Sequence, residues 1–413
     1  MKALVFGTKT QPFDPPPGAT KLVQNLASTP CALIDLPDPR PLRPDWYVVR
    51  PLLTGICGSD SKQILLDFEG DADSPMSAFV SFPQVLGHEV VGEVVEAGPE
   101  AQGFELGDRV VLNPWLTCVT RGVEPVCPAC VAGDLSLCWS FTSGELDKGI
   151  HTGTSSDATG GYAELLPAHS SMLFKVPDGL DDRRAVLADP FAVSLHSVTR
   201  NPPPPGGRVL VWGAGALGCT AVAILRALFP DVEVGVVAMF DAQADLVRKL
   251  GAHAVFRPLP AVEMVEQLAA WSGGVLQPPM DGMQAIPMCH PGFVDVAYDT
   301  IGKPETFEVE ARVLTARGTI VKSGVHAPGR WEWTPLYFKE LQMVGSNAFG
   351  IEEVRGVRRH GIEHYLDLAV SGEIDIARMV THEFPLTEWQ RAFEALGDQA
   401  RSGAIKVTLD PSR

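Results

Sequence analysis

The sequence predicts an α/β protein whose first part is rich in β-strands and whose second part alternates strands with helices. Up to about Leu166, short apolar runs are separated by Gly and Pro, which is typical of a compact β-rich domain. After Pro202-Pro203-Pro204-Pro205-Gly206-Gly207 the pattern changes, and buried strands begin to alternate with helices. With 413 residues, of which 45% are hydrophobic, the chain is long enough for two or three domains with their own cores.

The strands expected in the first part are apolar or alternating runs bounded by turn-forming residues. They span residues 1–6, 46–53, 85–96, 109–112 and 162–166. A cysteine-rich lobe follows the fourth of these strands, and a Gly/Ser/Thr-rich loop at 142–161 precedes the fifth. This part of the chain therefore has the strand content of a small β-rich domain.

Composition excludes several classes of function. The formal net charge of -17 argues against a nucleic-acid partner, because binding phosphates requires clustered Lys and Arg. No signal peptide is expected, because Met1-Lys2 is followed only by a short apolar run. The longest apolar stretch, Val209 to Phe229, contains three glycines and Arg226, so no membrane span is expected. We expect a cytoplasmic protein without a membrane partner.

The chain has eight cysteines, and four of them lie close together. They are Cys118, Cys127, Cys130 and Cys138, with intervening gaps of eight, two and seven residues. A two-residue gap lets both thiolates bind one ion, and four thiolates complete a tetrahedral structural zinc site. The alternative is a pair of disulfides or four unligated thiols. A reducing compartment favours the metal site.

A second candidate metal site joins two glycine-flanked segments. Gly55-Ile56-Cys57-Gly58-Ser59-Asp60 provides a thiolate, and Gly87-His88-Glu89 provides an imidazole. Zinc prefers these two kinds of side chain. Taken alone, such a pair is more typical of a core thiol and a surface imidazole. The other motifs of the chain are needed to distinguish a zinc site from a core thiol and a surface imidazole.

The second part opens with a glycine-rich turn in a strand–turn–helix–strand context. The strand Val209 to Trp212 leads directly into Gly213-Ala214-Gly215-Ala216-Leu217-Gly218, a helix runs to about Phe229, and a strand spans Val232 to Ala238. This G-x-G-x-x-G pattern lets a pyrophosphate approach the N-terminus of a helix. It predicts binding of a dinucleotide coenzyme; the alternative is a purely structural turn.

The sequence does not decide between NAD and NADP. A carboxylate that binds the ribose 2′-hydroxyl of NAD is expected about twenty residues after the glycines, and Ala238 stands there. Asp241 comes three residues later and is expected to cap a helix from Ala242 to Leu250. No Arg directly follows Ala238 to hold the 2′-phosphate of NADP.

Strand and helix continue to alternate after this point. The expected elements are a strand at 294–298, a helix at about 305–314 and a strand at 318–325. The connection from Arg257 to Pro291 is longer than such a unit needs and is expected to be a surface loop or a contact for a ligand or another subunit. Near the end, Thr387-x-x-Gln390 predicts a capping box. The helix it would cap carries core residues at Trp389, Ala392, Phe393 and Leu396.

Taken together, these segments resemble the zinc-dependent medium-chain alcohol dehydrogenases, and most closely their polyol and threonine dehydrogenase branch. The resemblance follows the family's order over nearly the whole chain. The segments that carry it are Gly55 to Asp60, Gly87 to Glu89, the four cysteines, Asp189-Pro190 followed by His196, Gly213 to Gly218, and Asp299-Thr300-Ile301-Gly302.

The resemblance implies a Rossmann domain with a doubly wound parallel sheet, inserted in a GroES-like β-rich catalytic domain. It places the catalytic domain at residues 1–192, with its zinc lobe at 113–140, the coenzyme domain at 193–345, and a return to the catalytic domain at 346–413. The active site is expected in the cleft between the domains. The coenzyme residues implied are Gly213, Gly215, Ala216, Leu217, Gly218, Ala238, Asp241, Ser323, Gly324 and Val325.

Each zinc ligand follows from a matching position. Cys57 and His88 match the first two ligands, and Asp189 stands where the third falls. Alcohol dehydrogenase itself has a Cys₂His site, so the aspartate is a departure that resembles the polyol branch. Glu89 matches a carboxylate that either approaches the metal or supports it through a salt bridge. Asp60 matches the carboxylate that orients the zinc-bound histidine.

The implied chemistry is oxidation of an alcohol beside a zinc ion with an open fourth position. Ser59 matches the hydroxyl that takes the proton of the substrate. In the family this proton usually passes on to a histidine, but Lys62 stands at that position here. Lys62 either completes the proton relay or is a surface residue. The gap of eight after Cys118 departs from the usual two, and the insertion Val119 to Val126 either bulges outward or leaves three thiolates at the lobe.

The expected function is hydride transfer between a secondary alcohol or polyol, or the matching ketone, and NAD or NADP. One alternative is a glutathione- or coenzyme-linked aldehyde dehydrogenase, such as a formaldehyde dehydrogenase, which would share every motif. A second is a zinc-binding homologue that has lost catalysis, although its catalytic ligands would be expected to be missing. The expected cofactors are two zinc ions and a nicotinamide coenzyme, and the expected assembly is a homodimer or homotetramer.

Overall fold

A computed structural model describes residues 1–67, 75–283 and 285–412. It divides into two compact units. The first unit comprises Met1–Ala192 and Phe349–Arg413, and the second comprises Val193–Ala348. No helix in these described ranges is both long enough and apolar enough to cross a membrane.

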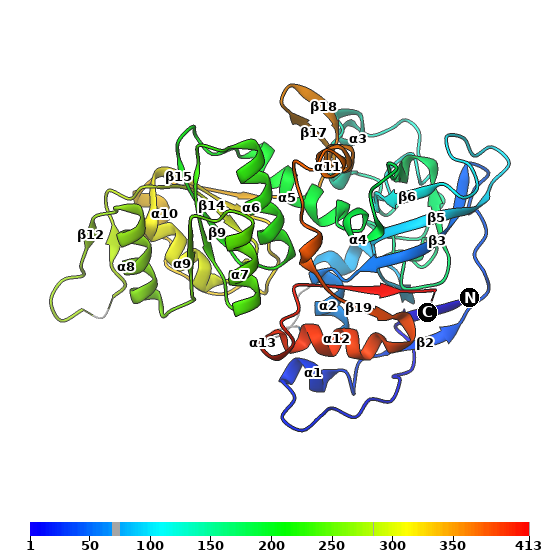
Figure 1. Ribbon diagram of the computed structural model, residues 1–413, viewed down its shortest axis with the longest axis horizontal. Coiled ribbons are helices and arrows are strands. Elements are labelled where there is room, and N and C mark those ends of the chain that lie inside the picture. Colours follow the sequence, from blue (N-terminus) through cyan, green and yellow to red (C-terminus); the bar gives the residue numbers. More distant parts are fainter. Residues whose placement is uncertain (68–74, 284, 413) are drawn as a thin grey trace. The chain divides into compact units, whose positions relative to one another are not determined.

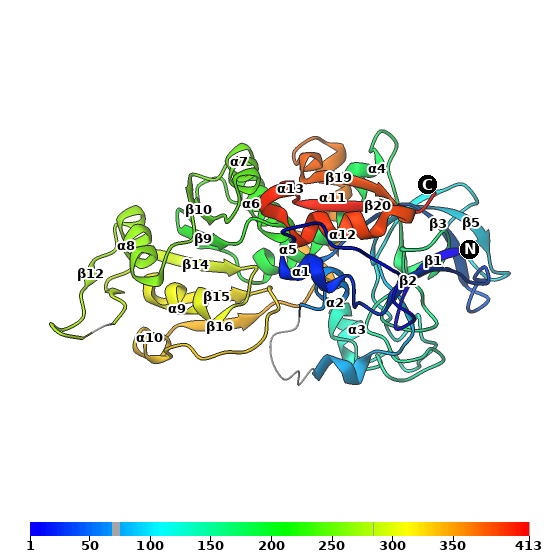
Figure 2. The ribbon, with the colours of Figure 1, turned by 90° about the horizontal axis from the view of Figure 1, so that it is seen from below.

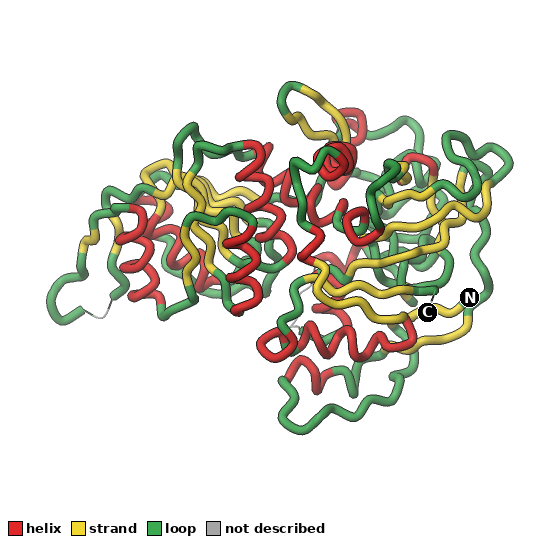
Figure 3. The backbone as a smooth tube through the Cα atoms, viewed as in Figure 1, coloured by secondary structure: helices red, strands yellow, loops and turns green. Residues whose placement is uncertain are grey.

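The first unit is built on a seven-stranded sheet (Figure 1). Its order is β19-β20-β3-β5-β6-β8, and β7 also pairs with β3. The strands are β3 (Trp46–Gly55), β5 (Glu89–Ala97), β6 (Arg109–Leu112), β7 (Leu166–His169), β8 (Leu173–Lys175), β19 (Val380–Pro385) and β20 (Lys406–Asp410). The last two strands come from the end of the chain, which therefore completes the sheet begun by its first part. Figure 3 shows the strands in yellow, with the C-terminus beside them.

Smaller sheets complete the strands of this unit. A three-stranded sheet has the order β2-β1-β4, and β17 and β18 form a hairpin. These strands are β1 (Lys2–Phe6), β2 (Cys31–Asp35), β4 (Gln84–Val85), β17 (Ile351–Val354) and β18 (Val357–His360). The predicted strand at 85–96 is thus two strands, and residues 86–88 between them carry His88.

The helices of the first unit are short, apart from α5, which continues into the second unit. They are α1 (Lys21–Asn25), α2 (Gly58–Ile64), α3 (Pro128–Ala132), α4 (Asp182–Ala185), α5 (Ala188–Arg200), α11 (Gly361–Val370), α12 (Trp389–Gly397) and α13 (Gln399–Ser402). Single 3₁₀ turns occur at Pro75–Phe79, Leu135–Leu137, Ser170–Met172, Ala377–Met379 and Leu386–Glu388. Helix α12 lies alongside β19 and β20 (Figure 2), and buries Trp389, Ala392 and Phe393 in a core shared with Tyr162 and Leu409.

The second unit has a six-stranded parallel sheet with the order β11-β10-β9-β14-β15-β16. The strands are β9 (Arg208–Trp212), β10 (Glu233–Val237), β11 (Ala254–Phe256), β14 (Val294–Asp299), β15 (Leu314–Lys322) and β16 (Gln342–Gly345). Its helices are α6 (Ala216–Leu228), α7 (Asp241–Lys249), α8 (Ala261–Ser272), α9 (Pro304–Val313) and α10 (Thr334–Phe338). Helices α6 and α7 lie on one side of the sheet and α8 and α9 on the other (Figure 1), which confirms the predicted doubly wound fold.

Four local predictions were wrong. The strand expected at 162–166 begins only at Leu166, because the preceding residues pair with β1 only through an isolated β-bridge between Ala163 and Ala3. The predicted loop at 257–291 contains helix α8, whose buried Met264, Val265 and Leu268 repeat at helical spacing, and a hairpin of β12 (Leu276–Gln277) and β13 (Met288–Cys289). Neither Thr387 nor Asp241 caps a helix: α12 begins at Trp389 after a 3₁₀ turn, and Asp241 is the first residue of α7.

Candidate metal centre and coenzyme loop

Strand pairing brings the two predicted zinc-binding segments together. β3 and β5 are antiparallel, and Gly55 pairs with Glu89, so the residues that follow β3 and precede β5 are neighbours. One ligand atom from each of Cys57, His88 and Glu89 lies within 4.8 Å of the other two. A Cβ at position 55 would lie 2.1 Å from Glu89 Oε2, so a larger residue there would displace this carboxylate.

Asp60 and Tyr162 orient the imidazole of His88. Asp60 Oδ1 lies 3.6 Å from His88 Nδ1, and Asp60 Oδ2 accepts a hydrogen bond of 2.8 Å from the Tyr162 hydroxyl. Burial opposes ionisation of Asp60, but the His88 charge and the Tyr162 hydroxyl outweigh it and hold the pKa of Asp60 below its usual value. Because Nδ1 faces this carboxylate, Nε2 is left for a metal.

The charges around His88 fit a cation. Burial lowers the pKa of His88, but Asp60 and Cys57 outweigh that effect and raise it well above its usual value. The same negative charges stabilise a divalent metal, and a thiolate, an imidazole and a carboxylate are ligands that zinc accepts. The donor set therefore fits zinc.

Asp189 lies in the first turn of α5, close to this set but outside the 4.8 Å group. Its side chain is buried, and burial raises the pKa of Asp189 to about 7, with Glu89 adding to the rise and His88 opposing it. These influences place Asp189 within electrostatic reach of both residues. The structure therefore brings the predicted third ligand near the metal centre without putting it in the closest group.

Glu89 has a second partner that the sequence did not indicate. Lys406, the first residue of β20, donates hydrogen bonds to Glu89 Oε1 at 2.7 Å and Oε2 at 2.6 Å, and to Ile56 O at 3.0 Å. Both side chains are about 2% exposed. A buried ammonium therefore holds both carboxylate oxygens of Glu89, which also belongs to the metal group.

The two predicted relay residues lie on the short helix α2. Ser59 is exposed in the first turn, directly after Cys57 and Gly58. Lys62 is half-buried and lies in the last turn. Helix α2 thus starts at the metal group. Along the chain, Ser59 is closer to Cys57 than Lys62 is.

A second histidine, which sequence reasoning missed, stands beside His88. The ring centroids of His151 and His88 are 4.6 Å apart, and Trp115 contacts His151 edge-on at 5.9 Å. His151 Nδ1 lies 2.7 Å from Thr152 O, and because a carbonyl only accepts, Nδ1 carries the proton and Nε2 is an acceptor. Burial, together with the His88 charge, lowers the pKa of His151 to about 3, so the ring is neutral.

The four lobe cysteines form a second metal group. Cys118, Cys127, Cys130 and Cys138 each place Sγ within 4.8 Å of the others, and all eight cysteines are free thiols. The backbone N–H groups of Trp139 and Ser140 donate to Cys127 Sγ at 3.5 Å and Cys138 Sγ at 3.3 Å. Hydrogen bonding from Cys130 lowers the pKa of Cys138 to about 5. This arrangement fits a four-thiolate zinc site.

The insertion Val119 to Val126 is anchored by Arg121. This side chain is fully buried, and all five of its N–H groups donate to backbone carbonyls. The acceptors are Leu116 O at 3.2 Å, Ser143 O at 3.0 Å, Leu146 O at 2.9 Å, Asp147 O at 2.9 Å and Gly149 O at 2.7 Å. Arg121 therefore joins the cysteine lobe to the segment that leads to His151.

The glycine-rich turn has the geometry of a dinucleotide site. Gly213 follows β9 with φ of +95°, and Gly215 precedes the first residue of α6, Ala216. Leu217 and Gly218 lie in the first turn of α6, and a Cβ on Gly218 would come within 1.9 Å of Gly213 O. Only glycine allows this contact, and the turn leaves the N-terminus of α6 open to a pyrophosphate.

The remaining predicted coenzyme residues follow the carboxyl ends of β10 and β15. Ala238 follows β10 and is fully buried, and the carboxylate of Asp241 pairs with Arg257. Ser323 and Gly324 donate their N–H groups to Asp299 O, both at 3.0 Å, and Val325 is exposed. In parallel sheets this edge is where ligands bind.

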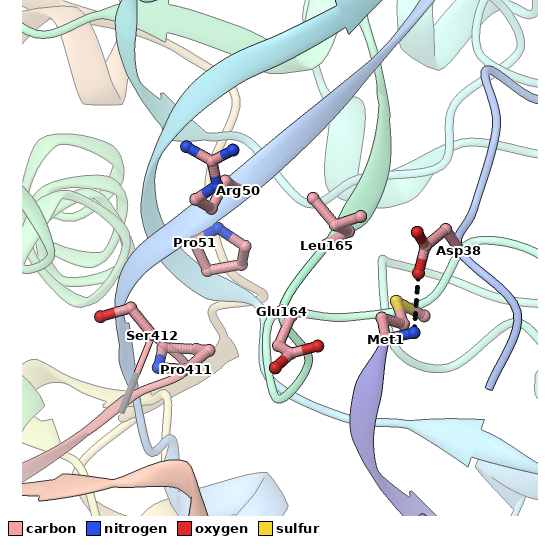
Figure 4. A pocket seen from close by; sticks show the side chains of 8 residues that line it. All are labelled: Met1, Asp38, Arg50, Pro51, Glu164, Leu165, Pro411 and Ser412. Carbon is pink, nitrogen blue, oxygen red and sulfur yellow. Dashed lines mark hydrogen bonds and ion pairs between the residues drawn. The ribbon is translucent and has the colours of Figure 1, made fainter. Parts of the chain in front are cut away.

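The first unit also has a surface pocket of about 360 Å³ (Figure 4). Its walls come from β3, from residues 164–165 and from both ends of the chain, and the N-terminal ammonium pairs with Asp38 at 2.7 Å. None of the predicted site residues lines it. It is therefore separate from the metal centre.

Comparisons with known proteins agree over most of the chain. The family model of the alcohol dehydrogenase GroES-like domain matches residues 43–178, and that of zinc-binding dehydrogenases matches residues 216–363. An L-threonine 3-dehydrogenase of Shewanella sp. (strain ANA-3) is 28% identical over 383 residues, covering 92% of this chain and 96% of the relative. The (R,R)-butanediol dehydrogenase of Saccharomyces cerevisiae is 25% identical over 392 residues, with coverages of 92% and 94%.

A solved structure shows the same fold. The 2R,3R-butanediol dehydrogenase from Bacillus subtilis matches with a TM-score of 0.71 and 22% identity, covering 99% of both chains.

Proposed function

Because the chain belongs to the zinc-dependent medium-chain alcohol dehydrogenase family, we propose that it transfers hydride between a secondary alcohol or polyol and NAD(P). The observation that carries this proposal is the meeting of the Cys57 and His88 ligand atoms within 4.8 Å, with the carboxylate of Glu89 equally close and Asp189 within electrostatic reach. When bound, zinc would supply the Lewis acidity that lowers the pKa of an alcohol, and the coenzyme would accept the hydride.

The residues of the chain have separate tasks in this reaction. Tyr162 holds Asp60, and Asp60 fixes the ring of His88 so that Nε2 faces the metal position. Ser59 is proposed to take the proton of the substrate hydroxyl, because its own hydroxyl lies exposed two residues after Cys57. Lys62 is proposed to pass that proton on from the last turn of α2.

We propose Cys57, His88 and Asp189 as the zinc ligands, with Glu89 held beside them by Lys406. Both oxygens of Glu89 are engaged by the ammonium, whereas Asp189 has only electrostatic neighbours within this group. Asp189→Asn should therefore lose catalytic zinc, and Glu89→Gln should keep it. Zinc counted per chain in the two variants distinguishes the roles; the reverse result would make Glu89 the ligand.

The names of the relatives support the proposed substrate class. Threonine and butanediol both carry a second polar group beside the carbon that is oxidised, and His151 Nε2 offers an acceptor next to His88 for such a group. A panel of simple alcohols, vicinal diols and β-hydroxy amino acids, assayed with NAD and with NADP, tests this class. Formaldehyde with glutathione belongs in the same panel, and turnover of that pair alone would favour the aldehyde dehydrogenase alternative.

We also propose that the chain forms a homodimer or homotetramer in the cytoplasm. Trp333, Tyr337 and Phe338 are 59%, 85% and 53% exposed around α10, next in sequence to β16 at the edge of the parallel sheet. Exposed aromatic groups at a sheet edge are typical of a subunit contact. Eight free thiols fit a reducing compartment. Light scattering during size-exclusion chromatography tests the assembly, and a monomer would contradict it.

A further inference from the structure

An arginine lies next to the position that selects between coenzymes. β10 and β11 are parallel, and Val237 pairs with Phe256. The residues that follow, Ala238 and Arg257, therefore lie side by side at the carboxyl edge of the sheet. Arg257 Nη1 donates a hydrogen bond of 3.1 Å to Ala238 O, which fixes the guanidinium at this edge.

The neighbouring position carries no charge that would reject a phosphate. A carboxylate at the end of this strand binds the ribose 2′-hydroxyl of NAD, and an arginine nearby accommodates the 2′-phosphate of NADP. Here the residue is Ala238, which is fully buried and uncharged. Nothing at this position therefore repels a 2′-phosphate.

The remaining carboxylate nearby is already paired with the arginine. Asp241 and Arg257 form an ion pair in which the side chains are 94% and 41% exposed. Such surface pairs contribute little to stability. A phosphate dianion offers a guanidinium two strong charge-assisted hydrogen bonds, so it can replace Asp241 as the partner of Arg257.

We propose that Arg257 is the contact for the 2′-phosphate of the coenzyme and that the chain therefore prefers NADP(H) to NAD(H). This inference rests on the proposed function and names its coenzyme. Asp241 is then a competing carboxylate that Arg257 releases when NADP binds.

Binding of NADP⁺, NAD⁺, 2′,5′-ADP and 5′-AMP, measured by isothermal titration calorimetry, tests the proposal without turnover. The wild-type protein should bind NADP⁺ at least tenfold more tightly than NAD⁺, and 2′,5′-ADP more tightly than 5′-AMP. Arg257→Met should remove this difference and leave NAD⁺ affinity unchanged. Asp241→Asn should raise affinity for NADP⁺. Arg248→Met is the matched control. Arg248 forms an exposed ion pair with Asp245 on α7, the helix that also carries Asp241.

Each of the following outcomes would overturn the proposal. Equal or tighter binding of NAD⁺ by the wild-type protein would contradict the NADP preference and leave the proposed function standing. Retained discrimination in Arg257→Met, with an unchanged circular dichroism spectrum, would assign the phosphate to another residue. Failure to bind any of the four ligands would overturn the proposed function as well.

Discussion

At the scale of single residues, Glu89 and Lys406 form a buried ion pair beside the metal centre. Taking two charges out of water is costly, and their attraction offsets this cost only while both partners are present. Lys406 donates to both oxygens of Glu89 and also to Ile56 O, so its three N–H groups are satisfied. Removing one member leaves the other charge buried without a partner.

Lys406→Met should therefore lower the free energy of unfolding by about 3–5 kcal/mol. Lys406→Met combined with Glu89→Gln should recover part of this loss, because no charge is left unpaired. Urea denaturation of the two variants measures both effects. Arg317→Met is the control, because Arg317 and Glu340 form an exposed pair whose loss should cost less than about 1 kcal/mol. Wild-type stability in Lys406→Met would contradict the buried-pair interpretation.

His151 presents a neutral acceptor beside His88. His151→Phe keeps an aromatic ring against His88 and Trp115 but removes Nε2. We expect KM for a vicinal diol to rise about tenfold, the effect of one lost hydrogen bond of about 1.4 kcal/mol, while KM for a simple alcohol changes little. His382→Phe, in β19, serves as the control. Equal changes for both substrates would mean that His151 has only a packing role.

Glu310 on α9, in the second unit, is an acidic residue whose burial is unexpected. It is fully buried, and among residues 1–67, 75–283 and 285–412 neither of its carboxylate oxygens finds a hydrogen-bond partner. Burial raises the pKa of Glu310 well above its usual value, and the nearby Asp299 raises it further. The native protein therefore keeps this proton at pH values where the unfolded chain has released it.

The sign of the pH effect follows from this difference. Stability from a protonated Glu310 is complete below the ordinary glutamate pKa and is lost as pH rises towards the raised native value. The loss is up to about 1.4 kcal/mol per pH unit. Glu310→Gln should therefore gain stability over the wild type as pH rises above about 5, measured by urea unfolding. Glu305→Gln, exposed on the same helix, should show no such trend; a trend of equal size there would exclude Glu310 as its source.

At the scale of elements, the insertion Val119 to Val126 is held to the protein by Arg121. Five carbonyls from two separate segments depend on this one guanidinium. The insertion therefore leaves all four thiolates together, and no ligand is lost. Its ends bulge outward, with Val119 and Val126 44% and 36% exposed, while Arg121 anchors it. The segment that leads to His151 is fixed by the same contacts.

Arg121→Met should lower the free energy of unfolding by more than about 3 kcal/mol, because several buried carbonyls lose their donors. It should also release zinc from the cysteine lobe faster, measured with a colorimetric chelator. Arg121→Lys keeps the charge but has only three donors. Its stability and its rate of zinc release should therefore lie between those of the wild-type protein and Arg121→Met. Zinc release at the wild-type rate in both variants would show that the lobe does not depend on this residue.

Sequence patterns were informative wherever the structure is local. The strand–turn–helix at Gly213 to Gly218 and the strands β3 and β9 could be predicted, because periodicity and glycine spacing act over a few residues. The helix α8 was missed although its apolar spacing is visible, because the whole segment 257–291 was interpreted as one long connection. The capping box at Thr387 failed because a 3₁₀ turn takes the place of the first helical turn.

At the scale of the whole molecule, the candidate metal centre depends on contacts that no local pattern records. Lys406 is 317 positions from Glu89, and only the pairing of β20 with β3 brings it to the site. Tyr162 is 102 positions from Asp60. Arg257 could not be connected with Ala238 from the sequence, because parallel pairing of β10 with β11 makes them neighbours. Family resemblance supplied the candidate ligands and Asp60, but not Tyr162 or Lys406, which hold Asp60 and Glu89.

The most direct measurement is zinc counted per chain, together with coenzyme reduction, in the wild-type protein, Cys57→Ala and Cys127→Ser. The wild-type protein should hold two zinc ions, one for each metal group. Cys57→Ala should stay folded, lose one zinc ion and lose turnover, whereas Cys127→Ser should lose the other zinc ion and melt at a lower temperature. Full zinc content and full turnover in Cys57→Ala would contradict the assignment of the catalytic metal centre.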